Sequence, residues 1–197
     1  MFRATEFLLP RPDGKNSARL LAAFNVKPFR TEWPVIRNEH PTAFKVCPGS
    51  RRLLLPTQNY VLLRRFSAKE ERRRLTASCL LASEVAEPFV AIENHLNYVY
   101  HADRQLSVDE IYGLAALFNS ALLDRYFRVI SGNTQVNATE IRCMKFPPLA
   151  TVAHIGRKVR ELASLDSDAV ELIALRELDI DRDVSTHLLE GTLFSHI

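Results

Sequence analysis

The stretch that decides the fold is SVDEIYGLAALFNSALLDRYFRV, residues 107–129. Ser107 and Glu110 have the spacing of a capping box, in which the serine hydroxyl accepts a hydrogen bond from a first-turn amide and the glutamate reaches back. Apolar residues then recur every three or four positions, which places them on one face of a helix. The pattern predicts a long helix from Ser107 to about Val129 that packs on a sheet.

The residues before this helix indicate β-structure. The first 56 residues are interrupted by prolines and glycines, which favours loops and short strands, with room for a short helix over Ser17–Phe24. Further along, four segments are rich in β-branched and aromatic residues and predict a small, mostly antiparallel sheet. These strand candidates are Asn59–Phe66, Leu75–Leu81, Phe89–Glu93 and Tyr98–Tyr100.

The sequence that follows the prolines at positions 147 and 148 favours helices. Helices are predicted at Thr151–Ser164, Ser167–Glu177 and Val184–Glu190. The fold class is therefore α+β: a small, mostly antiparallel sheet packed by one long helix, with a helical C-terminal appendage. We expect a main domain over residues 1–150 and an acidic helical extension over residues 151–197.

Composition excludes several classes of protein. A hydrophobic fraction of 47% and a charged fraction of 25% are ordinary for a globular protein. No apolar run approaches the ~18 residues that span a bilayer, and the first ten residues lack the apolar core of a signal peptide. Three widely separated cysteines suit a reducing compartment better than a disulfide framework or a zinc site. We expect a cytoplasmic protein without a membrane contact.

The small net charge of +3 conceals an asymmetry along the chain. Residues 160–197 hold three basic and nine acidic residues, a net charge of −6, whereas residues 1–159 hold 23 basic and 14 acidic residues, a net charge of +9. A basic body suits contact with a polyanion, and the acidic end suits a different partner.

The residue pattern indicates no catalytic, metal or cofactor site in this chain. The six histidines lack the i, i+4 spacing of a helical zinc site, and no serine lies in a nucleophile-elbow pattern. The six glycines never form Gly-x-Gly, so the backbone offers no glycine-rich loop for a phosphate or cofactor.

An arginine-rich run at residues 64–74 is the first candidate binding feature. It contains six cations and two anions, and the planar fork of arginine suits phosphate oxygens and guanine. A charged turn that keeps an edge strand from pairing would have the same composition. The cations that we expect to contact phosphate or groove are Arg64, Arg65, Lys69, Arg72, Arg73 and Arg74.

A polar loop at residues 131–137 is the second candidate. Its amides could read adenine in the major groove of DNA, although a helix C-cap at Gly132 followed by asparagine turns accounts for the same residues. The candidate DNA-facing side chains are Asn133, Thr134, Gln135 and Asn137, which could instead brace the loop.

The order of several short motifs resembles a known family. The motifs are YVLLRRFS at 60–67, Arg72-Arg73, IENHLNY at 92–98, LAALFNS at 114–120, DRYFR at 124–128, SGNTQVN at 131–137, Ile141-Arg142 and Phe146-Pro147-Pro148. Over roughly residues 28–150 the chain looks like the C-terminal target-recognition region of adenine-specific (N6) DNA methyltransferases of type II restriction–modification systems, the TaqI-like and related bifunctional enzymes.

The resemblance implies sequence-specific binding of double-stranded DNA by residues 1–150, beside a catalytic domain or subunit that binds S-adenosylmethionine. That catalytic half carries a glycine-bearing cofactor motif and an Asn/Asp-Pro-Pro-aromatic motif. Neither occurs here, because the segment Phe146-Pro147-Pro148-Leu149 lacks both the amide or carboxylate and the aromatic residue. The chain is then expected to be a separated or truncated recognition part.

Two other interpretations of the sequence stay open. One is a half-module of a type I restriction specificity subunit, which would continue into a long helix near Ile155–Leu165; that segment is short and lacks heptads. The other is a protein-interaction module in which the helix of residues 111–129 docks a partner and the arginines are solvated surface.

Overall fold

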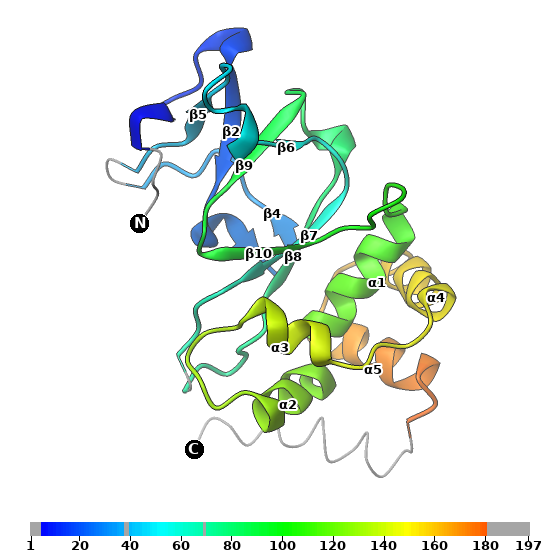
Figure 1. The fold of residues 1–197 in the computed structure, drawn as a ribbon. Coiled ribbons are helices and arrows are strands. Elements are labelled where there is room, and N and C mark those ends of the chain that lie inside the picture. Colours follow the sequence, from blue (N-terminus) through cyan, green and yellow to red (C-terminus); the bar gives the residue numbers. More distant parts are fainter. Residues whose placement is uncertain (1–4, 38–39, 69, 181–197) are drawn as a thin grey trace.

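The computed structural model describes residues 5–37, 40–68 and 70–180, and within these residues the chain forms two five-stranded sheets and five α-helices (Figure 1). Sheet 1 has the order β1-β5-β2-β9-β6, with bounds β1 Leu8–Leu9, β5 Ala43–Lys45, β2 Ser17–Leu21, β9 Phe89–Ile92 and β6 Leu55–Pro56. Sheet 2 has the order β10-β7-β8-β4-β3, with bounds β10 Leu96–Val99, β7 Tyr60–Arg64, β8 Ala77–Leu80, β4 Phe29–Thr31 and β3 Val26–Lys27.

The α+β class is confirmed, but the expectation of one small sheet was wrong. Most neighbouring strands are antiparallel, and the β2–β9 and β4–β8 pairs are parallel. Strands of two to five residues are too short to show an alternating pattern, so most of sheet 1 was hidden in the proline-rich start of the chain. The described residues also form five short 3-10 helices, of which the first precedes β1 and the other four lie between strands. They are η1 Thr5–Phe7, η2 Gly14–Asn16, η3 Ala23–Asn25, η4 Arg51–Leu53 and η5 Ala82–Glu84.

The short helix expected at Ser17–Phe24 was also wrong. This segment forms β2 and the start of η3. β2 pairs with β5 on one side and β9 on the other, and four of its five residues are buried. Pairing on both sides satisfies the backbone of β2, and this tertiary contact outweighs the weak local preference for helix.

The capping box at Ser107 is confirmed at the start of α1 (Val108–Asn119). The Glu110 amide donates to Ser107 Oγ over 3.1 Å, and the Ser107 amide donates to Glu110 Oε2 over 2.7 Å. Hydrogen bonds from the Arg104 guanidinium lower the pKa of Glu110 to about 2, so this carboxylate stays charged at the helix N-terminus.

The expected single helix from Ser107 to Val129 is in fact two helices. The backbone is extended at Ser120, and α2 (Ala121–Ile130) starts afresh. Two side chains satisfy the amides that this break exposes: Ser120 Oγ accepts from Leu123, and the buried Glu171 carboxylate accepts from the amides of Ala121 and Leu122. The apolar pattern runs through the break unchanged, so periodicity alone could not show it.

Up to residue 180, where the described part of the chain ends, three helices follow α2. The short α3 (Ala138–Cys143) was not anticipated, whereas α4 (Leu149–Arg160) and α5 (Ser167–Glu177) match the predicted helices. The helix expected at Val184–Glu190 lies outside the described residues.

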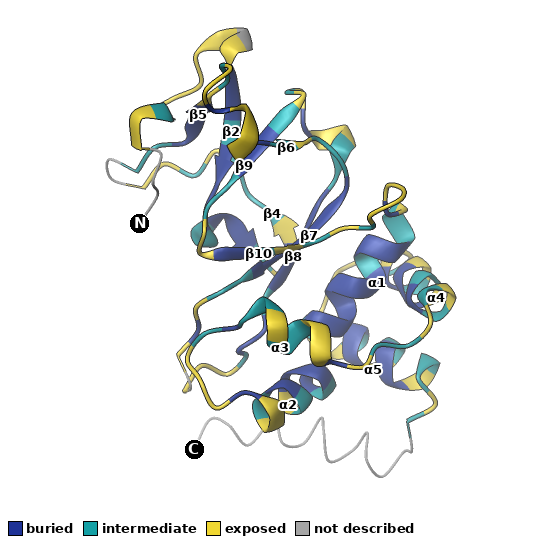
Figure 2. Cartoon of the chain, in the orientation of Figure 1, coloured by how far each residue is buried: buried dark blue, intermediate teal, exposed yellow. Residues whose placement is uncertain are grey.

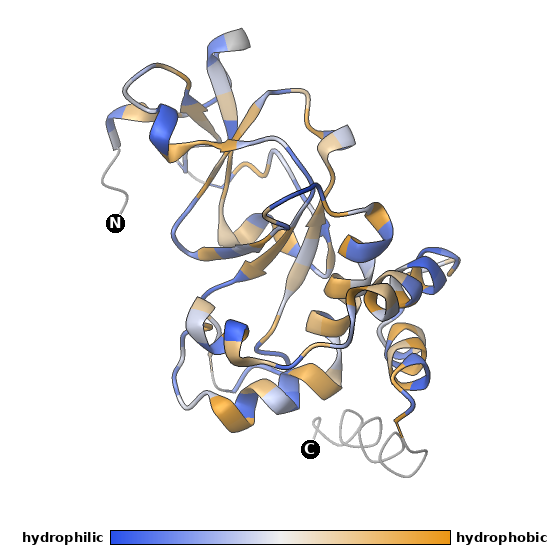
Figure 3. Cartoon of the chain, turned by 45° about the vertical axis from the view of Figure 1, so that its right-hand side comes forward, coloured by the Kyte–Doolittle hydropathy of each residue, from blue (hydrophilic) through white to orange (hydrophobic). Residues whose placement is uncertain are grey.

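The elements form three layers, with sheet 2 between sheet 1 and the helices. In β7, Tyr60 and Leu62 join the cluster shared with sheet 1, whereas Val61 and Leu63 join the cluster shared with α1. Because both faces of β7 are covered, its residues read as a continuous apolar run. Figure 2 shows the burial of α1 and the central strands, and Figure 3 shows that the helices carry both hydrophobic and hydrophilic residues. Val152 and Val170 place α4 and α5 in the core with α1; a domain division at residue 150 stays a prediction.

α1 and α4 pack in close backbone contact because each has a glycine where they cross. A Cβ atom on Gly113 would lie 1.9 Å from the Val152 carbonyl oxygen, and one on Gly156 would lie 1.8 Å from the Asp109 carbonyl oxygen. Both distances are far shorter than any real contact, so a side chain would push the helices apart.

Gly113→Ala is therefore expected to lower the free energy of unfolding by about 1–3 kcal/mol, because overpacking outweighs the better helix propensity of alanine. Urea denaturation measures this change. Gly132→Ala is the matched control: nothing lies within 4 Å of its added Cβ, and a shift within about 0.5 kcal/mol is expected. Equal stability of the two variants would contradict the close-packing argument.

Candidate nucleic-acid interface

The structure brings the arginine-rich run and the polar loop together, although residues 75–130 separate them in sequence. The Val136 amide donates to the Arg65 carbonyl over 2.7 Å, and the Ser67 amide donates to the Thr134 carbonyl over 3.3 Å. An antiparallel bridge joins Phe66 to Gln135 between them. The segment after β7 and the connection from α2 to α3 thus lie side by side (Figure 1).

Arg74 is the brace of this junction. It is only 2% exposed, and its guanidinium donates to Ser67 Oγ and to the carbonyl oxygens of Ser131 and Asn133. Its backbone amide donates to the Asp124 carboxylate over 2.6 Å. The guanidinium therefore makes its hydrogen bonds within the protein and is not available to a phosphate in this conformation.

Two further arginines of the run also hold protein groups. The Arg64 guanidinium donates to the Val26 carbonyl over 3.2 and 2.8 Å. Arg73 lies 3.9 Å from the buried Glu171 carboxylate, and burial lowers the pKa of Arg73. Arg64 still lines an open groove, described below, so its outer edge can meet a ligand.

The remaining predicted side chains lie at or near the surface. Arg72, Asn133 and Thr134 are exposed. Partly buried are Arg65, Gln135 and Asn137. The Arg65 guanidinium donates to the Asn94 carbonyl. The backbone amide of Asn137 donates to the Glu140 carboxylate where α3 begins. Lys69 lies outside the described residues. Whether these side chains contact DNA stays a prediction.

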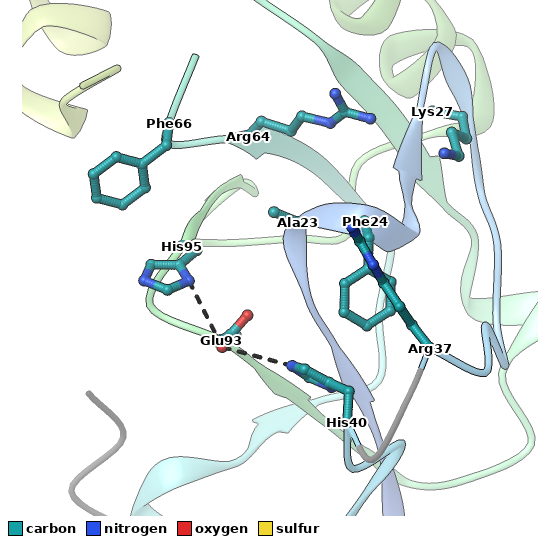
Figure 4. Close-up of a pocket in the computed structure, with 9 residues that line it drawn as sticks. All are labelled: Ala23, Phe24, Lys27, Arg37, His40, Arg64, Phe66, Glu93 and His95. Atoms are coloured by element: carbon teal, nitrogen blue, oxygen red, sulfur yellow. Dashed lines mark ion pairs between the residues drawn. The ribbon is translucent and has the colours of Figure 1, made fainter. Parts of the chain in front are cut away.

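A groove of about 740 Å³ opens where the ends of the two sheets meet, next to this junction (Figure 4). Its lining comes from η3, β3, the end of β7 and the turn between β9 and β10, together with two residues of the segment between β4 and β5. The lining side chains are Ala23, Phe24, Lys27, Arg37, His40, Arg64, Phe66, Glu93 and His95.

Cations and aromatic rings dominate the groove. Lys27, Arg37 and Arg64 supply positive charge, which favours an anionic ligand. Phe66 is 46% exposed and meets His95 edge to face, with ring centroids 5.2 Å apart. Aromatic surface beside positive charge occurs in proteins that bind nucleic acids, which present bases and phosphates together.

Sequence reasoning gave no role to most of this groove. Lys27, Arg37 and His40 lie in the proline-rich first part, where only loops and short strands were expected. Phe66, Glu93 and His95 fall within the quoted family motifs, but nothing in those motifs indicated that they meet. The pairing of β2 with β9 joins residues about 70 positions apart and brings η3 near the turn of residues 93–95. Such pairing leaves no local pattern in the sequence.

The described part of the chain contains no cluster of three or more side chains suited to hold a metal ion. Over the same residues, every helix is too short or too polar to cross a bilayer.

By sequence, the chain is homologous to part of type II methyltransferases. It is 42% identical over 160 residues to the type II methyltransferase M.BsuBI of Bacillus subtilis, a match that takes in 81% of this chain and 32% of that protein. It is 33% identical over 144 residues to the type II methyltransferase M.PstI of Providencia stuartii, with 73% and 28% covered. The chain thus spans about a third of the length of these relatives. No family model and no solved structure matches it.

The different roles of neighbouring arginines can be tested by stability. Arg74→Ala is expected to lower the free energy of unfolding by about 2–4 kcal/mol, because it leaves a cavity and unpaired carbonyl oxygens. Arg72→Ala removes an exposed side chain and should change stability by less than about 0.5 kcal/mol. Urea denaturation of both variants measures the difference, and similar stabilities would show that Arg74 is not a brace.

Proposed function

We propose that this chain is the DNA target-recognition part of a site-specific adenine-N6 DNA methyltransferase of a type II restriction–modification system. The observation that carries the proposal is the groove, in which cations and aromatic rings lie beside the braced loop of residues 131–137. The net charge of +9 over residues 1–159 and the similarity to type II methyltransferases over 81% of the chain support it. The adenine specificity rests on the sequence motifs.

The proposal divides the reaction between two parts. The amino group of a paired adenine is inside the duplex, so a catalytic domain must turn the base out before it transfers a methyl group. This chain holds the duplex and selects the site. Cations at the surface contact phosphates and fix the register, and side chains in the groove and loop meet base edges.

S-adenosylmethionine belongs to the catalytic domain in this proposal. The chain has no Gly-x-Gly sequence, and the groove is lined by cations that suit phosphate better than a sulfonium ion. No residue of this chain is therefore assigned to the cofactor. The catalytic domain, as a separate subunit or a further part of the same polypeptide, is the proposed protein partner.

Duplex binding should weaken steeply with salt if the basic body neutralises phosphates. Contact with ~5 phosphates predicts a slope of about −4 to −5 for the logarithm of the binding constant against that of the salt concentration. Fluorescence anisotropy with a labelled duplex, from ~50 to ~200 mM salt, measures it. Failure to bind any duplex at low salt would refute the proposal and favour a protein-interaction module.

Arg37→Ala and Arg72→Ala test the two cationic surfaces separately. Each should weaken binding to all duplex sequences alike and reduce the magnitude of the salt slope by about 1, because a phosphate contact carries no sequence information. Arg176→Ala, at an exposed position on α5, is the control and should leave binding unchanged. A changed sequence preference in either test variant would contradict its assignment to phosphate.

A further inference from the structure

Glu93 is the acidic side chain among the described residues that line the cationic groove. The backbone fixes its position, because its amide donates to the Leu21 carbonyl over 2.9 Å and its carbonyl accepts from the Leu96 amide over 3.0 Å. The side chain is 17% exposed. A recessed carboxylate on a hydrogen-bonded backbone, at the meeting point of two sheets, is well placed to contact a ligand group that enters the groove.

The Glu93 carboxylate does not fit a groove that binds phosphate alone. A negative charge among Lys27, Arg37 and Arg64 would repel a phosphate and weaken its binding. Three cations and one carboxylate together suit a ligand that presents both an anion and a hydrogen-bond donor. A nucleotide of DNA does so, since its phosphate can meet the cations while an exocyclic amino group of its base meets the carboxylate.

Two histidines of the groove flank the carboxylate. Glu93 Oε1 lies 3.7 Å from His95 Nδ1 and 4.0 Å from His40 Nε2, so it lies between the two imidazoles (Figure 4). Aromatic contacts hold both rings, because His95 meets Phe66 and His40 meets Phe24 edge to face. Among the described residues no partner occurs for Oε2, which leaves this oxygen for a ligand.

We infer that Glu93 is a specificity-determining residue that accepts a hydrogen bond from the N4 amino group of a cytosine in the target site. A carboxylate only accepts hydrogen bonds. In the major groove, guanine presents two acceptors and thymine one, which would repel it, and adenine places the N7 acceptor beside its amino group. Cytosine presents a donor without a neighbouring acceptor. This inference rests on the proposed function and adds the base that the groove reads.

Selection from a pool of randomised duplexes tests the inference with the 197-residue chain and its Glu93→Gln variant. The wild-type chain should select a site with a required cytosine. In the variant, adenine should replace that cytosine, because a glutamine amide both donates and accepts and so pairs with N6 and N7 of adenine. Substitution of the cytosine should weaken wild-type binding by ~5- to 150-fold, the range of one good base contact.

Two further variants serve as a charge-conserving test and as a control. Glu93→Asp keeps the charge but retracts the carboxylate, so it should weaken the cytosine preference without creating another. Glu84→Gln removes an exposed carboxylate outside the groove and should select the wild-type site. Thermal melting of each variant checks its fold.

The outcomes separate the inference from the proposed function. If the wild-type chain selects a site and both Glu93 variants select it with the same preference at every position, the reading of cytosine by Glu93 is overturned and DNA recognition stands. A wild-type site without a required cytosine overturns the inference in the same way. If the wild-type chain selects no sequence, target recognition itself is overturned.

Discussion

The candidate interface depends on the buried guanidinium of Arg74. This group joins Ser67, after β7, to the carbonyl oxygens of Ser131 and Asn133, after α2. The Asp124 carboxylate fixes the same point from α2, because it accepts from the backbone amides of Arg74 and Leu75. Together with the backbone hydrogen bonds between residues 65–67 and 134–136, these contacts hold the two loops as one surface. A buried charge of this kind is stable only while every donor has a partner, so the surface exists only when both loops are in place.

The sequence predicted best where the determinant is local. The capping box at Ser107 and the helix over Ser167–Glu177 depend on neighbouring residues, and both occur as expected. Prediction was wrong where distant contacts decide the structure. Ser17–Leu21 becomes a strand because β5 and β9 lie beside it. α1 ends at Asn119 partly because Glu171 caps the next helix at Ala121, from 50 residues further along the chain.

The same limit applies to the candidate site. Composition identified the arginine-rich run, but it could not separate the buried Arg74 from the exposed Arg72, two positions away. That distinction depends on which carbonyl groups lie nearby in the folded chain. The groove could not be predicted from local patterns, because its lining comes from three separate parts of the chain that the folded sheets bring together. These lining residues are Ala23, Phe24, Lys27, Arg37, His40, Arg64, Phe66, Glu93 and His95.

Glu171 connects the end of the described chain to the interface. From α5 it caps α2 and lies beside Arg73, so the helix that leads into the loop of residues 131–137 starts on a group contributed from beyond residue 170. This matters for any chimera that joins a segment of this chain to a segment of a related chain. A crossover near residue 150 would pair α2 with a foreign α5, and the loop would inherit any mismatch at its cap. The smallest unit that can be exchanged intact therefore extends through α5.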